Sequence, residues 1–506
     1  MDMTTTGAKA EPMPSTRPAA TRVTIDPITR LEGHGKIEIF LNSSGEVENA
    51  YFQVPELRGF EKFCQGRPVE ELARITPRIC GVCPEAHHIA SAKTLDAVFH
   101  VEPPPTGRKL RELLYNAFTA ADHALHFYAL AGPDFVVGPT APPAERNILG
   151  VIAKVGLEIG GAVIKHRAGG QEVVRIIGGK AVHPVCGLPG GVSKAITEQE
   201  RQRIEEIASG MVEFSKLSFK IFDDVVLKNK AYVDLILSDT YTHRTYYMGL
   251  VDDRNRVNFY DGKLRIVDPD GSEFAKFSAA EYLDHIVERV EPWSYLKFPY
   301  LKNVGWKGFV GGKDSGVYRV APLARLNASD GMATPLAQAE YEKMYETLGG
   351  KPVHATQATH WARIIEMMQA SETALQLARD PEITDPNVRT IPTATPTEGV
   401  GVVEAPRGTL FHHYSTDEKG MVRRVNLIVG TGNNHAAICM SIKKAAQGII
   451  KPGSKIDQGI LNMVEMAFRA YDPCLGCATH SLPGNMPLIV RVYDHRRQLV
   501  EQVVRD

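Results

Sequence analysis

The sequence predicts an α+β fold, with a mainly helical core of long packed helices and small β elements near the N-terminus, in the middle and near the C-terminus. Apolar residues recur at helical spacing over three long stretches that predict the core, at about 105–235, 336–380 and 435–470. Short segments bounded by turn residues predict the β elements, at about 22–56, 245–325 and 407–430. With 506 residues, 43% of them hydrophobic and 23% charged, the chain is long enough to bury a large core.

Alternation and turn residues define the β elements. In the first, Ile37, Ile39 and Leu41 alternate before a turn with the sequence Asn-Ser-Ser-Gly. In the middle β-rich segment, Asp-Gly pairs at 261–262 and 270–271 indicate turns between short strands. We therefore expect hairpins in these regions, the middle one being a β-rich insertion in the helical core.

Most of the sequence outside the β elements has patterns that predict helices. Residues 108–132 have near-helical apolar spacing. Thr197, followed three residues later by Glu200, forms the capping-box pattern that precedes a helix. These signals predict long helices between the first two β elements.

Charge and cysteine content exclude several classes of protein. The net charge of −1 and the pI near 7.0 offer no basic face to a nucleic acid. No apolar run approaches the roughly 20 residues that cross a bilayer, so no membrane span is expected in this chain. Residues 1–21 lack the apolar core of a secretory signal and are predicted to be a flexible tail. The odd count of seven cysteines argues against a disulfide framework and for a reducing, cytoplasmic location.

Four of the seven cysteines occur in two Cys-x-x-Cys motifs. Cys80 and Cys83 belong to "RICGVCPEAHH", and Cys474 and Cys477 to "DPCLGCATH". Four thiolates can bind zinc, an iron–sulfur cluster or nickel. A structural zinc site usually has its two pairs within about 15–20 residues of each other. Because these pairs lie at opposite ends of the chain, the spacing favours a catalytic site over a structural one, without selecting the metal.

The residues around the cysteines select among these metals. "RICGVCPEAH" and "DPCLGCATH" closely resemble the two signature motifs of the large, catalytic subunit of nickel–iron hydrogenases. The flanking sequence is most similar to the cytoplasmic, multi-subunit, cofactor-coupled group. Further landmarks in the family's order extend the resemblance over nearly the whole chain, at 26–39, 57–61, 121–134, 178–184 and 404–410.

The resemblance implies a nickel–iron centre that splits dihydrogen reversibly. Nickel would be bound by Cys80, Cys83, Cys474 and Cys477, and Cys83 and Cys477 would bridge to an iron that carries carbon monoxide and cyanide. The metal pair would take the hydride and Cys474 the proton. Glu32 matches the family's first proton-relay carboxylate, although without its surrounding motif it would be interpreted as a solvated surface charge.

The same resemblance assigns supporting residues around the centre. Arg407 would lie over the iron and bind a cyanide, and His87 would donate a hydrogen bond to a cysteine sulfur. His88 is predicted to be an ordinary core histidine. The remaining supporting residues are Pro406 beside Arg407, Thr431 near the other cyanide, and Asp122 and Asp472 holding the guanidinium group.

A second, non-catalytic divalent ion, usually magnesium, is also implied. Its ligands would be Glu61, His480 and the carbonyl of Leu427. This donor set suits a hard cation but is not distinctive, and a surface charge is the alternative for Glu61.

The remaining cysteines bear on the partners of the chain. Cys64, Cys186 and Cys439 are too few to hold a four-thiolate cluster, so the electrons must leave through another polypeptide. The resemblance identifies this polypeptide as an iron–sulfur small subunit, with further electron-transfer subunits behind it. The sequence does not select the final acceptor.

The resemblance divides the chain into the tail 1–21, a large-subunit domain 22–480 and a maturation tail 481–506. A dedicated endopeptidase is expected to cleave after His480 once nickel is bound. Residues 487–494 predict a strand, so a permanent edge strand is the alternative.

Two other functions remain open. One is a hydrogen sensor that signals to a kinase; such sensors generally end at the last histidine, and the further 26 residues of this chain favour the enzyme. The other is a zinc-stabilised scaffold without catalysis.

Overall fold

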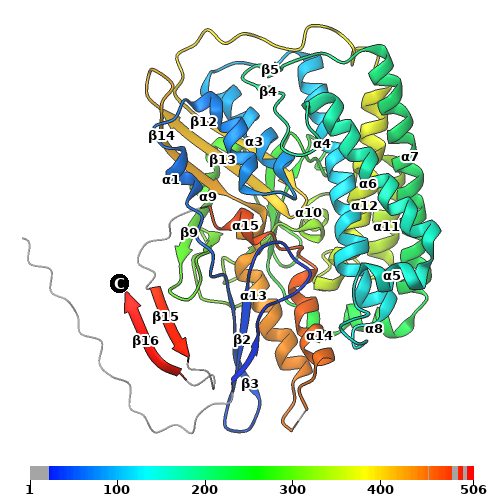
Figure 1. Cartoon of the computed structure of the whole chain (residues 1–506), viewed down its shortest axis with the longest axis vertical. Helices are drawn as coiled ribbons and strands as arrows, with labels where there is room; N and C mark the ends of the chain where they lie inside the picture. Colours follow the sequence, from blue (N-terminus) through cyan, green and yellow to red (C-terminus); the bar gives the residue numbers. More distant parts are fainter. Residues whose placement is uncertain (1–21, 454, 481–487, 494–498, 506) are drawn as a thin grey trace, which may run out of the picture.

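The computed structural model describes residues 22–453, 455–480, 488–493 and 499–505. Most of the long helices lie side by side along one side of the molecule, whereas the first and the last of them pack against the β elements on the other (Figure 1). The long helices are α3 Pro84–Val98, α4 Pro105–Leu125, α6 Leu157–Gly178, α7 Glu198–Phe222, α11 Pro335–Thr347, α12 Thr359–Ala378 and α13 Gly430–Ile449. The shorter ones are α1 Phe60–Cys64, α2 Leu72–Ile75, α5 Ile148–Val155, α8 Lys230–Leu237, α9 Tyr282–His285, α10 Pro322–Ala328, α14 Gln458–Arg469 and α15 Leu475–Ala478. This arrangement confirms the predicted α+β class.

The strands form small, mostly antiparallel sheets. The first sheet has the order β1-β2-β3 and a middle one the order β11-β6-β7-β8, in which β11 pairs parallel with β6. Their bounds are β1 Arg22–Ile25, β2 Lys36–Leu41, β3 Val47–Gln53, β6 Tyr246–Val251, β7 Lys263–Val267, β8 Glu273–Phe277 and β11 Tyr318–Arg319. Pairs are formed by β4 Gly187–Leu188 with β5 Gly191–Val192, and by β9 Ile286–Val290 with β10 Lys297–Leu301. Strands β6 to β11 thus lie in the segment predicted to be rich in β structure.

Two local predictions for helices have different outcomes. The side chains of Thr197 and Glu200 form the capping box at the start of α7, as expected. The helical stretch 108–132, by contrast, changes its winding: α4 ends at Leu125, and wider π-helical turns follow at His126–Ala131 and Pro133–Val137. Pro133 has no backbone N–H and its ring clashes with the preceding turn, so the regular hydrogen-bond ladder cannot continue through it.

A further sheet consists of β12 Glu398–Ala405, β13 Gly408–Thr416 and β14 Val422–Ile428. The β13–β14 pair is the hairpin predicted at 407–430. Helix α3 lies directly on this sheet. A Cβ atom at Gly399 would come within 2.5 Å of the Val98 nitrogen, and one at Gly401 within 2.6 Å of the Ala90 carbonyl oxygen. Glycine on β12 is therefore what allows the helix to approach so closely.

No helix in the described ranges is both long and apolar enough to cross a membrane. Beyond His480, β15 Leu488–Tyr493 pairs antiparallel with β16 Leu499–Arg505. This confirms the strand predicted at 487–494. The tail 1–21 lies outside the described residues.

Candidate metal centre

Two short loops from opposite ends of the chain bring the four motif cysteines together. Cys83 directly precedes Pro84, the first residue of α3, and Cys80 follows a short 3-10 turn that ends at Ile79. Cys474 directly precedes α15, and Cys477 lies within it. Each pair of cysteines is therefore held at the start of a helix by the local backbone.

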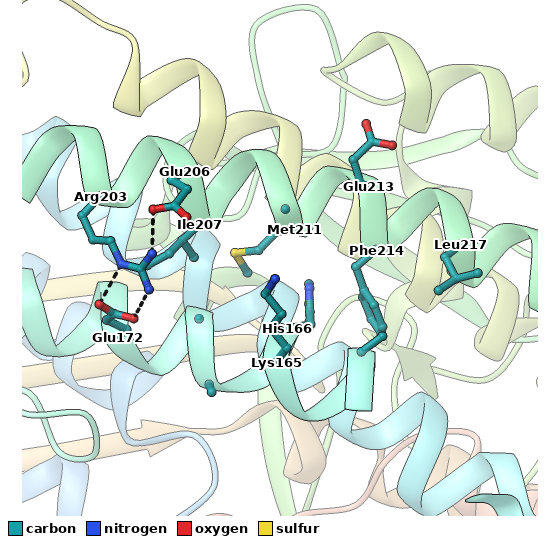
Figure 2. A pocket seen from close by; sticks show the side chains of 14 residues that line it. Lys165, His166, Glu172, Arg203, Glu206, Ile207, Met211, Glu213, Phe214 and Leu217 are labelled. Atoms are coloured by element: carbon teal, nitrogen blue, oxygen red, sulfur yellow. Dashed lines mark hydrogen bonds and ion pairs between the residues drawn. The ribbon is translucent and has the colours of Figure 1, made fainter. Parts of the chain in front are cut away.

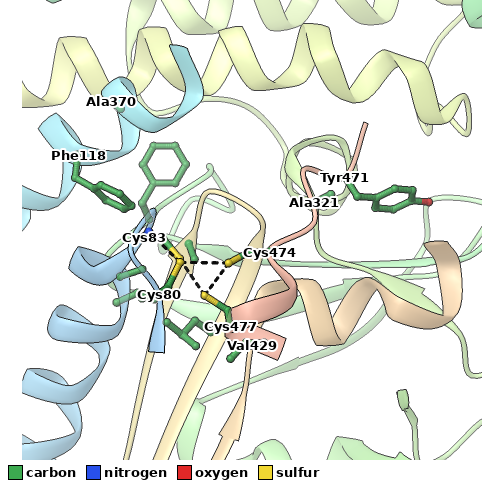
Figure 3. Packing of buried hydrophobic residues seen from close by; sticks show 14 of the residues in the cluster. Cys80, Cys83, Phe118, Ala321, Ala370, Val429, Tyr471, Cys474 and Cys477 are labelled. Carbon is green, nitrogen blue, oxygen red and sulfur yellow. Dashed lines mark hydrogen bonds between the residues drawn. The ribbon is translucent and has the colours of Figure 1, made fainter. Parts of the chain in front are cut away.

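The four sulfur atoms form one buried cluster (Figure 3). All lie within 4.8 Å of one another, and no disulfide joins them. The Sγ–Sγ distances are 3.3 Å for Cys80–Cys474, 3.2 Å for Cys83–Cys477 and 3.0 Å for Cys474–Cys477. Within the described ranges, no other group of three or more histidine, cysteine or acidic side chains could hold an ion. The tertiary structure thus makes one site of two distant motifs.

Burial opposes ionisation at this cluster. It raises the pKa of the Cys474 and Cys477 thiols well above the usual range. Several thiolates at contact distance repel one another unless a cation neutralises them. Soft metal ions prefer sulfur ligands, and their charge reverses this effect. The donor set therefore fits a thiophilic metal.

Glu32 lies against the cluster. Its Oε2 atom is 3.0 Å from the Sγ of Cys474 and accepts a hydrogen bond from the Gly476 N–H at 2.8 Å. The backbone holds this contact, because Glu32 forms a parallel bridge with Cys474 in which its N–H donates to Pro473 and its carbonyl accepts from Leu475. The carboxylate is thus in hydrogen-bond contact with a thiol.

Arg58 and Gly476 help to join the two loops, and neither was predicted from the sequence. The guanidinium group of Arg58 donates to the carbonyls of Ile79 and Gly476, one beside each cysteine pair. A Cβ atom at Gly476 would lie 2.6 Å from Oε1 of Glu32, so any larger residue there would displace that carboxylate. Arg58 lies in the family landmark at 57–61, "LRGFE", and this was the signal that could have identified it.

Arg407 lies buried among acidic side chains. Its guanidinium group pairs with Asp122 at 3.2 Å and Asp472 at 2.9 Å. Burial lowers the pKa of Arg407, but the two carboxylates outweigh it and hold the pKa well above its usual value. The Nε atom of Arg407 has no hydrogen-bond partner, although it is buried. An unpaired buried donor of this kind is costly and suits a polar ligand.

Other predicted residues also lie near the centre. Thr431 accepts a hydrogen bond through its hydroxyl from the Cys474 N–H at 2.9 Å. The Pro406 carbonyl accepts from two buried arginines, Arg325 and Arg363, which were not predicted to lie near the site. Arg363 also lies 3.5 Å from Asp472. Asp472 is therefore shared between Arg407 and a second guanidinium group.

The two adjacent histidines differ in their contacts. The Nε2 atom of His87 lies 3.4 Å from the Sγ of Cys477. His88 points elsewhere: its Nδ1 donates to the Ala73 carbonyl at 2.7 Å, and its Nε2 accepts from the Gly187 N–H at 2.8 Å. Both ring nitrogens of His88 are satisfied by backbone, as expected for a core histidine.

Glu61, His480 and Leu427 also meet. Oε1 of Glu61 lies 3.1 Å from Nδ1 of His480 and accepts from the Leu427 N–H at 2.8 Å. Burial raises the pKa of Glu61, but His480 and its other partners outweigh this and lower it. Glu288 and Lys297, paired at 3.2 Å on β9 and β10, contribute charge nearby. The sequence carried no signal for these two.

A large hollow of about 510 Å³ lies elsewhere, between α6 and α7 (Figure 2). Arg203 at its rim pairs with Glu172 at 2.9 Å and Glu206 at 2.6 Å. None of the predicted site residues lines it. The chemistry is concentrated at the cysteine cluster.

Comparison with known proteins agrees with this geometry. The sequence profile of the family described as nickel-dependent hydrogenase matches residues 58–147 and 162–480, and a HoxL-like profile matches residues 22–57. The chain belongs to the nickel-dependent hydrogenase family.

Individual relatives match over nearly their whole length. The chain is 50% identical over 482 residues to an F420-non-reducing hydrogenase iron-sulfur subunit of Archaeoglobus profundus, covering 95% of this chain and 99% of the relative. It is 38% identical over 498 residues to NAD-reducing hydrogenase HoxS subunit beta of Cupriavidus necator, covering 96% and 99%. A chain from a crystal structure of an NAD+-reducing [NiFe]-hydrogenase in the H2-reduced state superposes with a TM-score of 0.83 at 37% identity, covering 91% and 100%.

Proposed function

We propose that this chain is the catalytic subunit of a nickel–iron hydrogenase that reversibly splits dihydrogen into protons and electrons. The observation that carries the proposal is the contact of 3.0 Å between the Glu32 carboxylate and the Sγ of Cys474, at the edge of a closed cluster of four thiols. Nickel and iron, when bound by Cys80, Cys83, Cys474 and Cys477, would supply the Lewis acid that takes the hydride. The family membership supports this chemistry.

The protein's own groups handle the proton and shape the site. Cys474 would receive the proton, and Glu32 would accept it through their direct contact. The unpaired Nε of Arg407 would donate to a cyanide ligand of the iron, while Asp122 and Asp472 keep the guanidinium group in place. Cys83 and Cys477, in contact at 3.2 Å, would help to hold both metals.

A divalent ion, such as magnesium, would bind at Glu61, His480 and the Leu427 carbonyl. A carboxylate with a lowered pKa and an imidazole nitrogen 3.1 Å from it are reasonable ligands for such an ion. The ion would tie the last residues before position 481 to α1 and β14.

The iron–sulfur partner would dock over the Cys80–Cys83 loop. A hollow of about 340 Å³ there is strongly basic, and His183 on its rim contacts the Cys80 carbonyl at 3.1 Å. The side chain of Phe63 is 54% exposed in the same surface, with Arg67 over its ring. Aromatic and arginine side chains are typical of protein interfaces. The other cationic residues lining this hollow are Arg74, Arg78 and Lys180.

We further propose a cytoplasmic complex with additional electron-transfer subunits, in line with the F420-non-reducing and NAD-reducing relatives. The mature domain would span residues 22–480, and a maturation endopeptidase would remove residues 481–506. His480 is buried, and its carbonyl accepts from the Glu61 N–H at 3.1 Å. Cleavage after it would free a carboxylate beside the centre.

Metal analysis and isotope exchange test the proposal together. The chain is produced with its maturation proteins and iron–sulfur partner, and nickel, iron and zinc are measured before hydrogen–deuterium exchange. Equal amounts of nickel and iron with exchange activity are expected. Zinc alone would support the scaffold, and metal-loaded protein that controls a kinase without turnover would support the sensor. Intact mass of the active protein tests the cleavage, because a chain ending at Asp506 would contradict it.

A further inference from the structure

Four buried side chains, His87, His412, Tyr414 and Ser91, form a continuous chain of contacts leading away from Cys477; we call them the histidine relay. His87 Nε2 lies 3.4 Å from Cys477 Sγ, and His87 Nδ1 lies 3.1 Å from His412 Nε2. His412 Nδ1 lies 2.6 Å from the Tyr414 hydroxyl oxygen, which in turn lies 3.0 Å from Ser91 Oγ. None of these four residues is more than 1% exposed, so the relay is shielded from water along its whole length.

The helical repeat of α3 and the two-residue repeat of β13 bring these side chains into line. His87 and Ser91 are four residues apart on α3 and therefore share one face of that helix. His412 and Tyr414 are two residues apart on β13 and share one face of the strand. The Thr94 hydroxyl also donates to the His412 carbonyl at 3.2 Å, which fixes the strand against the helix. The four groups therefore face one another between helix α3 and strand β13.

The protons on the two imidazole rings limit the directions that the hydrogen bonds of the histidine relay can take. Both rings are fully buried and none of their nitrogen contacts is a carboxylate, so the uncharged form is favoured and each ring carries one proton. A cysteine that binds a metal is a thiolate and can only accept a hydrogen bond. His87 must then carry its proton on Nε2, facing Cys477, and its Nδ1 becomes an acceptor.

The same count of protons determines the tautomer of His412. The only relay atom that faces Nδ1 of His87 is Nε2 of His412, so this nitrogen must carry the proton of that ring. Nδ1 of His412, now unprotonated, then accepts from the Tyr414 hydroxyl, whose single proton turns from Ser91 to His412. Every donor in this arrangement points towards the sulfur.

We propose that His412 is a positioning residue that sets the tautomer of His87 and thereby the hydrogen bond to the Cys477 thiolate. The inference rests on the proposed function, because it requires Cys477 to be a metal ligand. His412 touches neither the substrate nor a reacting atom; it acts through His87. A donated hydrogen bond withdraws negative charge from the sulfur, so the metals receive less electron density and are reduced more easily.

His412→Leu and His412→Gln test this role as a pair. Leucine offers neither donor nor acceptor, whereas the glutamine amide can donate to His87 and accept from Tyr414. In the assembled, metal-loaded complex we expect His412→Leu to lose about 10- to 100-fold in turnover. We also expect its nickel midpoint potential, followed by electron paramagnetic resonance during a redox titration, to become more negative. His412→Gln should restore most of both.

Tyr414→Phe should shift the potential in the same direction by a smaller amount. The matched control is Tyr128→Phe, which removes another buried tyrosine hydroxyl bonded to a serine, at 2.8 Å from Ser218, and should leave the potential unchanged.

An unchanged potential in both His412→Gln and Tyr414→Phe, with His412→Leu either unchanged or unfolded, would overturn the proposal. So would a glutamine variant as impaired as the leucine variant. Parent protein without nickel or exchange activity would instead contradict the proposed function, which separates the two failures.

Discussion

The two sides of the cysteine cluster differ in the kind of group that contacts the sulfur. Beside Cys474 lies Glu32, a half-buried carboxylate that can gain and lose a proton. Beside Cys477 lies His87, with His412 in contact behind it; the two rings are 1% and 0% exposed, and burial lowers their pKa values. One side is suited to moving a proton and the other to holding a fixed dipole. Sulfur atoms only 3.0 Å apart can therefore have different roles.

The largest expected effect concerns the cluster that both sides share. Cys83→Ser or Cys477→Ser should abolish assembly of the nickel–iron centre, because each side chain would bridge both metals. The measurement is nickel and iron content with hydrogen uptake. Cys439→Ser, at a buried cysteine outside the cluster, is the control and should keep both metals. Full metal content and hydrogen uptake in either cluster variant would refute the assignment.

Glu32→Gln tests the proton side alone. The amide cannot accept the proton from Cys474, so we expect hydrogen–deuterium exchange to slow by about 10²- to 10⁴-fold while the metals remain bound. Glu48→Gln, at an exposed carboxylate on β3, should match the parent. Parent-like exchange in Glu32→Gln would remove Glu32 from the proton path and leave the two sides of the cluster without a functional difference.

Gly476→Ala tests the position of the Glu32 carboxylate, because it displaces this group without removing it. The new methyl group would lie 2.6 Å from Oε1 of Glu32, so the carboxylate must move away from Cys474. We expect exchange to slow by about tenfold, which corresponds to roughly 1.4 kcal/mol in the barrier. Gly81→Ala in the other motif meets no atom within 4 Å and is the control. Equal rates in the two variants would show that the position of Glu32 is not critical.

The smallest effect is expected at Glu61, beyond the cluster. Glu61→Gln in the metal-free chain should lower the free energy of unfolding by about 1.5–3 kcal/mol at neutral pH, the usual value for a hydrogen bond to a charged group. The folded-state pKa of Glu61 is lowered below its ordinary value of 4.5, so its contribution is present above that value and disappears as the pH falls through the folded-state pKa. Denaturant unfolding at pH 7 and below 4.5 measures this, with exposed Glu70→Gln as control. A difference that stays constant with pH would contradict the charge-based explanation.

Local sequence signals predicted much of the fold. The capping box at Thr197 and Glu200 and the hairpin β13–β14 form where alternation and capping rules place them, because these elements depend on neighbours in sequence. The winding of the chain after Leu125 was not predicted in detail. There the regular helical pattern gives way to π turns around Pro133, where the backbone loses a donor.

The sequence by itself determined the candidate metal ligands, two Cys-x-x-Cys pairs, and predicted Glu32 and Arg407 beside them from the motifs that surround them. Only the tertiary structure decided which further groups contact each side of the cluster. Arg58 and Gly476 lie within family landmarks but had no role predicted for them, and His412 lies outside every motif; all three act through contacts with residues far away in the chain. The physical reason is that a thiolate's ligand character is a property of the residue, whereas its pKa and hydrogen bonds depend on the groups that packing places around it.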